Sequence, residues 1–149
     1  MRIGVISDTH GLLRPQVREV FSGVDHILHA GDIGGEDVLA ELGRIAPVTA
    51  CAGNNDGWRC GTAGKTARVT LDGLRFLLVH VRDDAEEQLR REPADVVVFG
   101  HSHKPLDEHG GGIWWFNPGS AGPRRFKLPV TVARLDVRGG KLTAGHVEL

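Results

Sequence analysis

The sequence predicts an α/β fold in which two mixed β-sheets pack as a sandwich flanked by helices. Three observations predict it. Short apolar runs of strand length alternate with amphipathic segments through the first hundred residues. The pair Asp72-Gly73, a strong two-residue hairpin signal, interrupts this alternation. The last third of the chain shows only strand patterns, and alternating β and α segments followed by strands are typical of a layered α/β sandwich.

The N-terminal part begins with the apolar run Ile3–Ser7, which has the pattern of a buried strand. A helix is expected over Pro15–Val24, because proline suits the first helical position and apolar residues recur there at helical spacing. The alternation continues with a strand, a helix and a strand at His26–Ala30, Glu36–Ile45 and Pro47–Ala52.

The middle and C-terminal parts are richer in strands. The hairpin joins Arg68–Leu71 to Leu74–His80, and a polar helix follows over Asp83–Arg91, ending before Pro93. The remaining strands are predicted at Asp95–Phe99, Gly112–Phe116, Val130–Val137 and Leu142–Glu148.

Length and composition limit the class of protein. The chain of 149 residues and 16.1 kDa is predicted to form one domain, residues 1–149, with an ordinary 40% of hydrophobic residues. No 18-residue apolar run and no signal peptide are visible, so we expect a cytoplasmic protein without a membrane partner. A net charge of −1 disfavours nucleic acid as a partner. Cys51 and Cys60 lack the spacing of a zinc or redox site and are expected to be free thiols.

Polar residues suited to metal binding follow the ends of five predicted strands. Ligands of open α/β sheets bind beyond the carboxyl ends of the strands. The sequence therefore predicts one metal site built from seven residues. These are Asp8, His10, Asp32, Asn54, His80, His101 and His103.

The chemistry of this set indicates two metal ions. Four imidazoles, two carboxylates and one amide are too many for one tetrahedral zinc, and they do not form the all-oxygen cage of Ca²⁺ or Mg²⁺. The mixed nitrogen and oxygen donors fit two divalent ions, with Mn²⁺ as the first candidate and Ni²⁺, Fe²⁺ or Zn²⁺ as alternatives. Two such ions would leave the site positive, which suits a phosphate group.

The motifs resemble those of the calcineurin-like metallophosphoesterases. They are Asp8-x-His10, Gly31-Asp32, Gly53-Asn54-x-Asp56, His80 and Gly100-His101-x-His103. The late element Asn117-Pro118-Gly119-Ser120 resembles the small bacterial and archaeal branch of YfcE-like phosphodiesterases.

The resemblance implies a fold and a role for each ligand. It implies the metallophosphoesterase-type sandwich, with Asp8, His10 and His103 on one ion. Asn54, His80 and His101 would hold the other, Asp32 would bridge them, and a metal-bridging hydroxide would be the nucleophile rather than a side chain. Asn54 would also lie beside the substrate phosphate.

Two positions depart from the family pattern. Asn55 stands where many larger members have the histidine that is taken to protonate the leaving group, and an amide transfers no proton at neutral pH. Leaving groups that depart unprotonated should therefore react best. Arg82 follows His80 closely and is a candidate phosphate ligand; the alternative is a salt bridge with Asp83 or Asp84, or a solvated side chain. Asn54, Asn55 and Arg82 are the candidate substrate-binding residues.

The leading hypothesis is a dinuclear metal-dependent phosphodiesterase acting on a small phosphodiester. The alternative is a catalytically weak, metal-binding scaffold resembling VPS29, or a metal-binding regulator without turnover. A scaffold has no need of all seven ligands, so their presence favours the enzyme. A homodimer is expected from the family resemblance alone.

The sequence also predicts where several other residues lie in the fold. His26 is expected at a strand entry, His29 in packing or behind the ligands, His109 in a loop and His146 on an exposed strand face. Trp114 and Trp115 must lie on opposite faces of their strand, one in the core. The basic segment Pro123–Lys127 is either a solvated loop or a contact for an anionic substrate or a partner.

Overall fold

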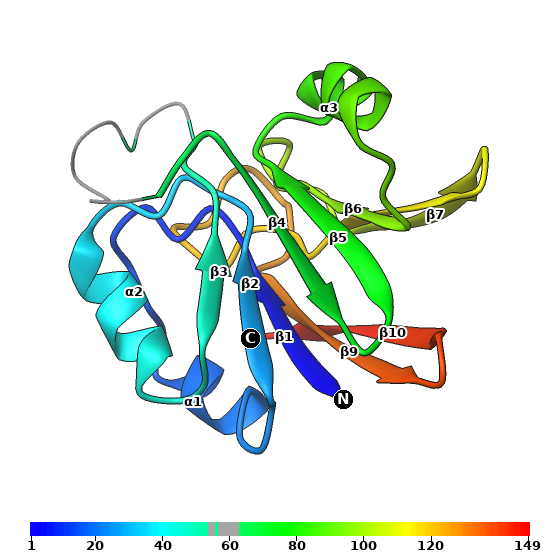
Figure 1. The fold of residues 1–149 in the computed structure, drawn as a ribbon. Helices are drawn as coiled ribbons and strands as arrows, with labels where there is room; N and C mark the ends of the chain where they lie inside the picture. Colours follow the sequence, from blue (N-terminus) through cyan, green and yellow to red (C-terminus); the bar gives the residue numbers. More distant parts are fainter. Residues whose placement is uncertain (54–55, 57–62) are drawn as a thin grey trace.

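Two five-stranded sheets lie face to face in the computed structural model, which describes residues 1–53, 56 and 63–149 (Figure 1). The strand order is β10-β9-β1-β2-β3 in the first sheet and β4-β5-β6-β8-β7 in the second. Each sheet mixes parallel and antiparallel pairs, as in β1 with β2 and β1 with β9. The predicted sandwich of two mixed sheets is confirmed.

The elements fall close to their expected places. The first sheet contains β1 (Arg2–Ile6), β2 (His26–His29), β3 (Val48–Ala50), β9 (Thr131–Arg138) and β10 (Lys141–Glu148). The second contains β4 (Thr66–Leu71), β5 (Leu74–Val79), β6 (Val96–Val98), β7 (Leu106–Gly110) and β8 (Ile113–Asn117). The helical elements are α1 (Gln16–Val20), α2 (Glu36–Gly43), the 3₁₀ turn η2 (Arg82–Asp84) and α3 (Ala85–Arg91). None of the helices in these described ranges is long and apolar enough to cross a membrane.

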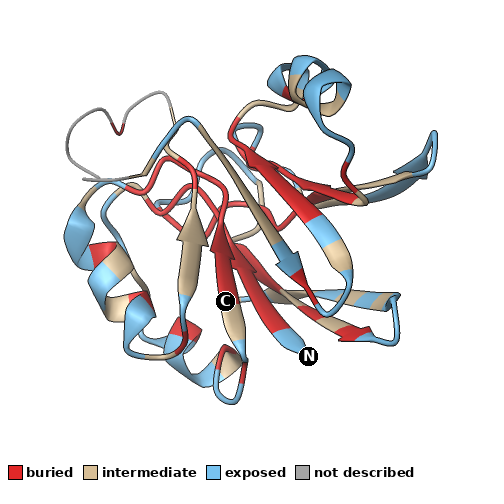
Figure 2. Cartoon of the chain, viewed as in Figure 1, coloured by how far each residue is buried: buried red, intermediate tan, exposed pale blue. Residues whose placement is uncertain are grey.

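Three apolar layers hold the fold together. The central layer lies between the sheets, the second joins the first sheet to α1 and α2, and the third joins the other sheet to α3. Successive residues of β1 serve two layers, since Val5 faces the central one and Ile6 faces the helices. That double burial explains why this strand has no charged or polar side chain from Ile3 to Ile6. Figure 2 shows burial concentrated on β1, β2 and β5. Removing a fully buried ring such as Phe76 would cost about 3–5 kcal/mol.

Both helices of the N-terminal half are shorter than predicted. α1 ends at Val20 rather than Val24, and a turn closes at Gly23, whose φ of 80° suits glycine. The predicted apolar stripe is nevertheless buried, because Val17, Phe21 and Val24 all pack in the layer between the first sheet and its helices.

The strand β7 was missed, so the loop predicted for His109 is wrong. Its sequence, Leu106–Gly110, is mostly polar and exposed, and it pairs with β8 at the edge of the sheet formed by the described residues. An edge strand with little burial gives no apolar alternation to detect. The His109 ring lies over Trp114, with 4.2 Å between the ring centroids.

His146 is half-buried rather than on an exposed face. Its ring stacks on Phe116, 5.0 Å between centroids, and its Nε2 lies 2.7 Å from the carbonyl oxygen of Asn117. The tryptophan pair does take opposite faces: Trp114 packs on the central layer and Trp115 on the layer beneath α3. Cys51 is a free, buried thiol, and Cys60 lies outside the described residues.

A buried histidine ties together the loops that follow β1 and β2. The backbone N–H of Gly31 donates to Nδ1 of His29 (3.2 Å), so Nε2 carries the proton and donates to Thr9 Oγ1 (3.0 Å). The Thr9 hydroxyl donates in turn to the carbonyl oxygen of Ile33 (2.7 Å). Burial lowers the pKa of His29 to about 3. His29 is thus a neutral bridge between the two loops.

This bridge predicts a specific acid sensitivity. The unfolded chain binds a proton on His29 below about pH 6.5, whereas the native state does not until about pH 3. The resulting stability is fully present above pH 6.5 and is lost as the pH falls, by up to about 1.4 kcal/mol per pH unit. Urea unfolding of metal-free protein at pH 7.5, 6 and 5 measures it. His29→Gln keeps one donor and one acceptor but cannot titrate, so its stability should fall less. Equal acid losses in wild type and His29→Gln would contradict the neutral bridge.

Candidate metal centre

The candidate ligands that the structure describes meet where strands of both sheets end. Asp8 and His10 follow β1, and Asp32 follows β2, all in the first sheet. The second sheet supplies His80 directly after β5, and His101 and His103 after β6. Asn54 and Asn55 lie outside the described residues. Residues from distant parts of the chain thus converge on the edge where the two sheets face each other.

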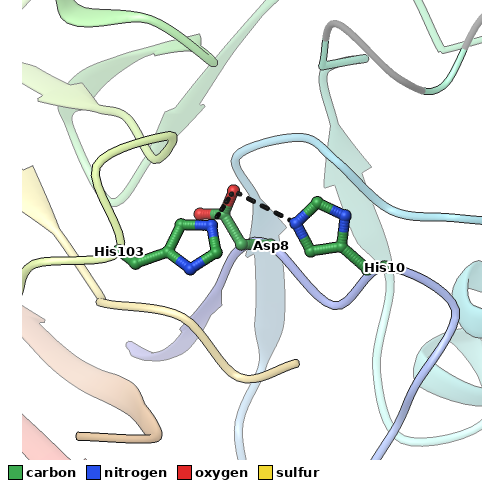
Figure 3. Close-up of side chains that lie close together, drawn as sticks. All are labelled: Asp8, His10 and His103. Atoms are coloured by element: carbon green, nitrogen blue, oxygen red, sulfur yellow. Dashed lines mark ion pairs between the residues drawn. The ribbon is translucent and has the colours of Figure 1, made fainter. Parts of the chain in front are cut away.

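The first group contains Asp8, His10 and His103, whose ligand atoms all lie within 4.8 Å of one another. Both imidazoles point toward the Asp8 carboxylate (Figure 3). Oδ1 of Asp8 lies 3.4 Å from Nε2 of His103 and 3.9 Å from Nε2 of His10. The carboxylate is fully buried, so its surroundings rather than solvent must balance its charge.

The second group contains Asp32, His80 and His101, under the same 4.8 Å limit. Nε2 of His80 lies 3.1 Å from Oδ2 of Asp32. The Nδ1–H of His80 donates to the carbonyl oxygen of Ala30 (2.8 Å), which leaves Nε2 to face the carboxylate. A hydrogen bond of this kind orients many metal-binding histidines. His101 is exposed, so this group opens to solvent.

The two groups adjoin each other. Oδ2 of Asp32 lies 3.8 Å from Nε2 of His10, and Oδ1 of Asp8 lies 3.8 Å from Nε2 of His80. Each carboxylate therefore contacts a histidine of the other group. Each group also draws on both sheets, because His103 joins Asp8 and His10 while Asp32 joins His80 and His101.

The backbone at these positions is strained. Among the described residues, seven non-glycine positions have positive φ, and five of them are candidate ligands. They are Asp8 (56°), His10 (48°), Asp32 (52°), His101 (69°) and His103 (63°). Such conformations cost of the order of 1–3 kcal/mol each and persist where a site requires them. Hydrogen bonds between the loops hold this geometry, as from Asp8 N to Gly31 O (3.0 Å) and from His10 N to Asp32 O (2.9 Å).

Close backbone approach explains the glycine before His101. A Cβ on Gly100 would overlap Ser7 Oγ and would come within 2.8 Å of Asp8 Oδ2. With glycine there, the N–H of His101 donates to Asp8 Oδ2 (3.2 Å). The loop after β6 can therefore lie against the loop after β1.

Burial and charge act in opposite directions on the titrating groups. Burial raises the pKa of Asp8, and the nearby charge of Asp32 adds to the rise, against the effects of His80 and His103. Burial alone would lower the pKa of His80, but its contacts with Asp32, Ala30 and Asp8 outweigh burial and raise it. Burial lowers the pKa of His103, and the positive charge of Arg125 lowers it further. The imidazoles thus partly offset the negative charge of the two carboxylates.

Several buried polar atoms of the candidate ligand residues have no hydrogen-bond partner among the described residues. Oδ1 of Asp8, Nε2 of His10 and Nδ1 of His103 are buried and make no hydrogen bond within the described part of the chain. Leaving such groups without a partner costs several kcal/mol in apolar surroundings. Nitrogen and oxygen donors in two adjoining groups fit divalent transition metals. The described residues therefore fit the metal ions that the sequence implies.

Arg82 points away from the two ligand groups. Its guanidinium lies over the Trp115 ring, 4.6 Å from the centroid, and pairs with Glu108 at 3.4 Å. The ion pair is therefore with Glu108 on β7, not with the expected Asp83 or Asp84. A contact between Arg82 and phosphate stays a prediction, which requires the side chain to leave Glu108.

Some supporting residues received no role from the sequence. Asp56 is buried and accepts hydrogen bonds from Gly53 N (2.7 Å) and Gly34 N (3.0 Å), which fixes the loop after β3 against the loop after β2. Asn117 donates to the carbonyl oxygen of Gly100 (3.2 Å), and so supports the loop that carries His101. Both residues lie in motifs described above, but a short polar motif does not show which distant backbone groups its side chains contact.

No sequence pattern indicated that Lys65 lies beside the site. Lys65 lines a cavity of about 530 Å³ together with Gly53, His80 and Asp84. A lysine there adds positive charge beside the second ligand group.

Comparison with known proteins gives close agreement over most of the chain. The calcineurin-like phosphoesterase superfamily domain matches residues 1–140. A probable metallophosphoesterase of Methanothermobacter thermautotrophicus is 36% identical over 97% of this chain and 90% of its own length. The phosphodiesterase YfcE of Escherichia coli is 30% identical over 91% of this chain and 88% of its own.

Solved structures agree on the fold. A structure described as a novel archaeal phosphodiesterase has a TM-score of 0.82 and 26% identity, covering 99% of this chain and 100% of the other. A Vps29 mutant from Entamoeba histolytica has a TM-score of 0.79 at 21% identity, covering 100% and 99% respectively, which shows likeness of fold alone. With the domain match and the sequence relatives taken together, the chain belongs to the calcineurin-like phosphoesterase superfamily, in its YfcE-like branch.

Proposed function

We propose that the protein is a dinuclear metal-dependent phosphodiesterase that hydrolyses small phosphodiesters. The observation that carries the proposal is the pair of adjoining ligand groups, each with one carboxylate and two imidazoles. The names of the relatives support a hydrolase acting on phosphate esters, since several of them are called phosphodiesterases.

Asp8, His10 and His103 would hold one ion, while His80 and His101 would hold the other together with Asn54. Asp32 would bridge the ions, because its Oδ2 lies between His80 and His10, at 3.1 and 3.8 Å. When bound, two divalent ions lower the pKa of a water molecule and neutralise charge on a transferring phosphoryl group. Mn²⁺ is our first candidate, with Ni²⁺, Fe²⁺ and Zn²⁺ as alternatives.

The protein's own residues position the reacting groups. The hydrogen bond from His80 Nδ1 to the carbonyl oxygen of Ala30 orients that imidazole, and the packing that buries Asp8 and Asp32 keeps bulk water from the base of the site. Asn54 and Asn55 are proposed to contact the substrate phosphate, with Arg82 as a further candidate. Asn55 cannot supply a proton, so esters of acidic alcohols should be the better substrates.

A scaffold role is the second candidate. The likeness to Vps29 favours it at the level of fold only. A surface that serves only to dock a partner does not need strained backbone at five ligand positions, so the geometry favours catalysis. A cytoplasmic location and a homodimer stay predictions from the sequence.

Hydrolysis of bis-p-nitrophenyl phosphate tests the function. We expect chelator-stripped protein to be inactive, and activity to appear on adding Mn²⁺ because the two ligand groups then become occupied. Release of p-nitrophenolate is followed by absorbance, with p-nitrophenyl phosphate as the monoester comparison, which should react more slowly. Inactivity with Mn²⁺, Ni²⁺, Fe²⁺ and Zn²⁺ alike would contradict the proposal.

The bridging role of Asp32 is tested by Asp32→Asn. Removing one negative charge from between the groups should reduce turnover at least about 100-fold, since loss of even an outer-shell partner costs 10–100-fold. Metal content per chain, measured by plasma emission spectrometry, should fall below that of wild type. The control variant is Asp37→Asn, which makes the same substitution at an exposed position on α2. Its metal content should equal that of wild type. Full activity in Asp32→Asn would exclude the bridging role.

A further inference from the structure

A second cavity opens beside the exposed histidine of the site. It has a volume of about 410 Å³, and His101 is among the residues that line it. His101 also belongs to the second ligand group, with Asp32 and His80. One imidazole therefore borders both the candidate metal centre and the cavity, so a group bound at the centre is adjacent to the cavity.

The walls of this cavity are mainly apolar. Val81, Phe99, Pro105 and Leu106 contribute side chains to them. Phe99 is 5% exposed and belongs to the apolar layer beneath α3, which holds that wall in place. Apolar and aromatic walls around a few polar groups are typical of small-molecule sites.

Two cations and one carboxylate, that of Asp83, line the cavity as well. Lys104 lines it, and Arg82 forms the side toward the outer face of the second sheet. The guanidinium of Arg82 stands 5.6 Å from the Phe99 ring centroid and 4.6 Å from that of Trp115, and it pairs with Glu108. These contacts place the guanidinium of Arg82 beside both aromatic rings at the edge of the cavity. Beyond Arg82 lies a separate hollow lined by Leu89 and Trp115.

We propose that the cavity beside His101 is a subsite for an aromatic ester group of the substrate. The proposal rests on the proposed function, which places the phosphate at the ligand groups. Apolar walls favour a ring over a short alkyl or a sugar-like group. Arg82 and Lys104 favour electron-rich rings, because cations are attracted to the faces of aromatic systems. The substrate class is then a phosphodiester with at least one aryl ester group.

The test compares two inert ligands of protein loaded with Mn²⁺. Phenylphosphonate and methylphosphonate share a head group, and neither is hydrolysed, so leaving-group chemistry plays no part. Calorimetry measures the dissociation constant of each. We expect phenylphosphonate to bind roughly tenfold more tightly, as partial burial of an aromatic ring predicts.

Variants locate the preference. Leu106→Ser removes part of the apolar wall, and the ratio of the two dissociation constants should fall toward one. Leu106→Trp fills the cavity and should lower the ratio as well, whereas the conservative Leu106→Met should retain it. Leu89→Ser is the matched control, because Leu89 packs in the same apolar layer but is not among the described residues that line this cavity. Circular dichroism verifies the fold of each variant.

The outcomes separate this inference from the proposed function. Equal affinities of wild type for the two phosphonates, or a ratio that Leu106→Trp leaves unchanged, would overturn the subsite. Metal-dependent hydrolysis of bis-p-nitrophenyl phosphate together with equal affinities would remove the subsite and leave the function. A tenfold ratio that depends on Leu106, without hydrolysis by any metal, would remove the function and leave a binding site for aromatic phosphonates.

Discussion

Two carboxylates buried side by side are the constraint on which the rest of this structure depends. Asp8 is fully buried and Asp32 is 4% exposed, and neighbouring negative charges away from water repel each other strongly. Positive charge must therefore be available on the spot, from protonated imidazoles or from metal ions. The histidines arranged around the carboxylates meet that requirement: contact with the carboxylates raises the pKa of His80, and the histidines oppose the rise that burial gives to the pKa of Asp8.

The scaffold around the carboxylates shows how such a centre is maintained. Five candidate ligands have left-handed backbone, at a total cost of several kcal/mol. Hydrogen bonds from buried polar groups hold the loops that contain them. These groups are the His29–Thr9 bridge, Asp56 and Asn117. Three apolar layers supply the favourable free energy against which this strain is tolerated. Buried polar contacts thus hold the ligand loops, while among the described candidate ligands His101 is exposed and His10 is partly exposed.

Much of this fold is accessible to sequence reasoning, for an identifiable physical reason. Segments buried on both sides, such as Ile3–Ile6 of β1 and the whole of β6, must be apolar, so their position and the polar residues that follow them are visible in the sequence. β7 was not visible because an exposed edge strand has no burial to impose a pattern. The partners of Arg82 and His146 could not be predicted. Glu108 lies on β7, which pairs with β8, and Asn117 lies in the sheet opposite the one that contains His146, so no local pattern encodes either contact. The convergence of ligands from separate strands was predictable, whereas the distances between them were not.

Each ligand group contains residues from both sheets, and this has a consequence for the folding of the chain. The groups are complete only when the sheets are docked in the correct register, because Asp8, His10 and Asp32 come from one sheet and their partners from the other. A cation that requires a complete group has little affinity for chains whose halves are apart, so its binding free energy adds to the stability of the docked state. Bound metal ions would then stabilise the docked arrangement of the two sheets, and this stabilisation would increase with the concentration of free cations in the cell.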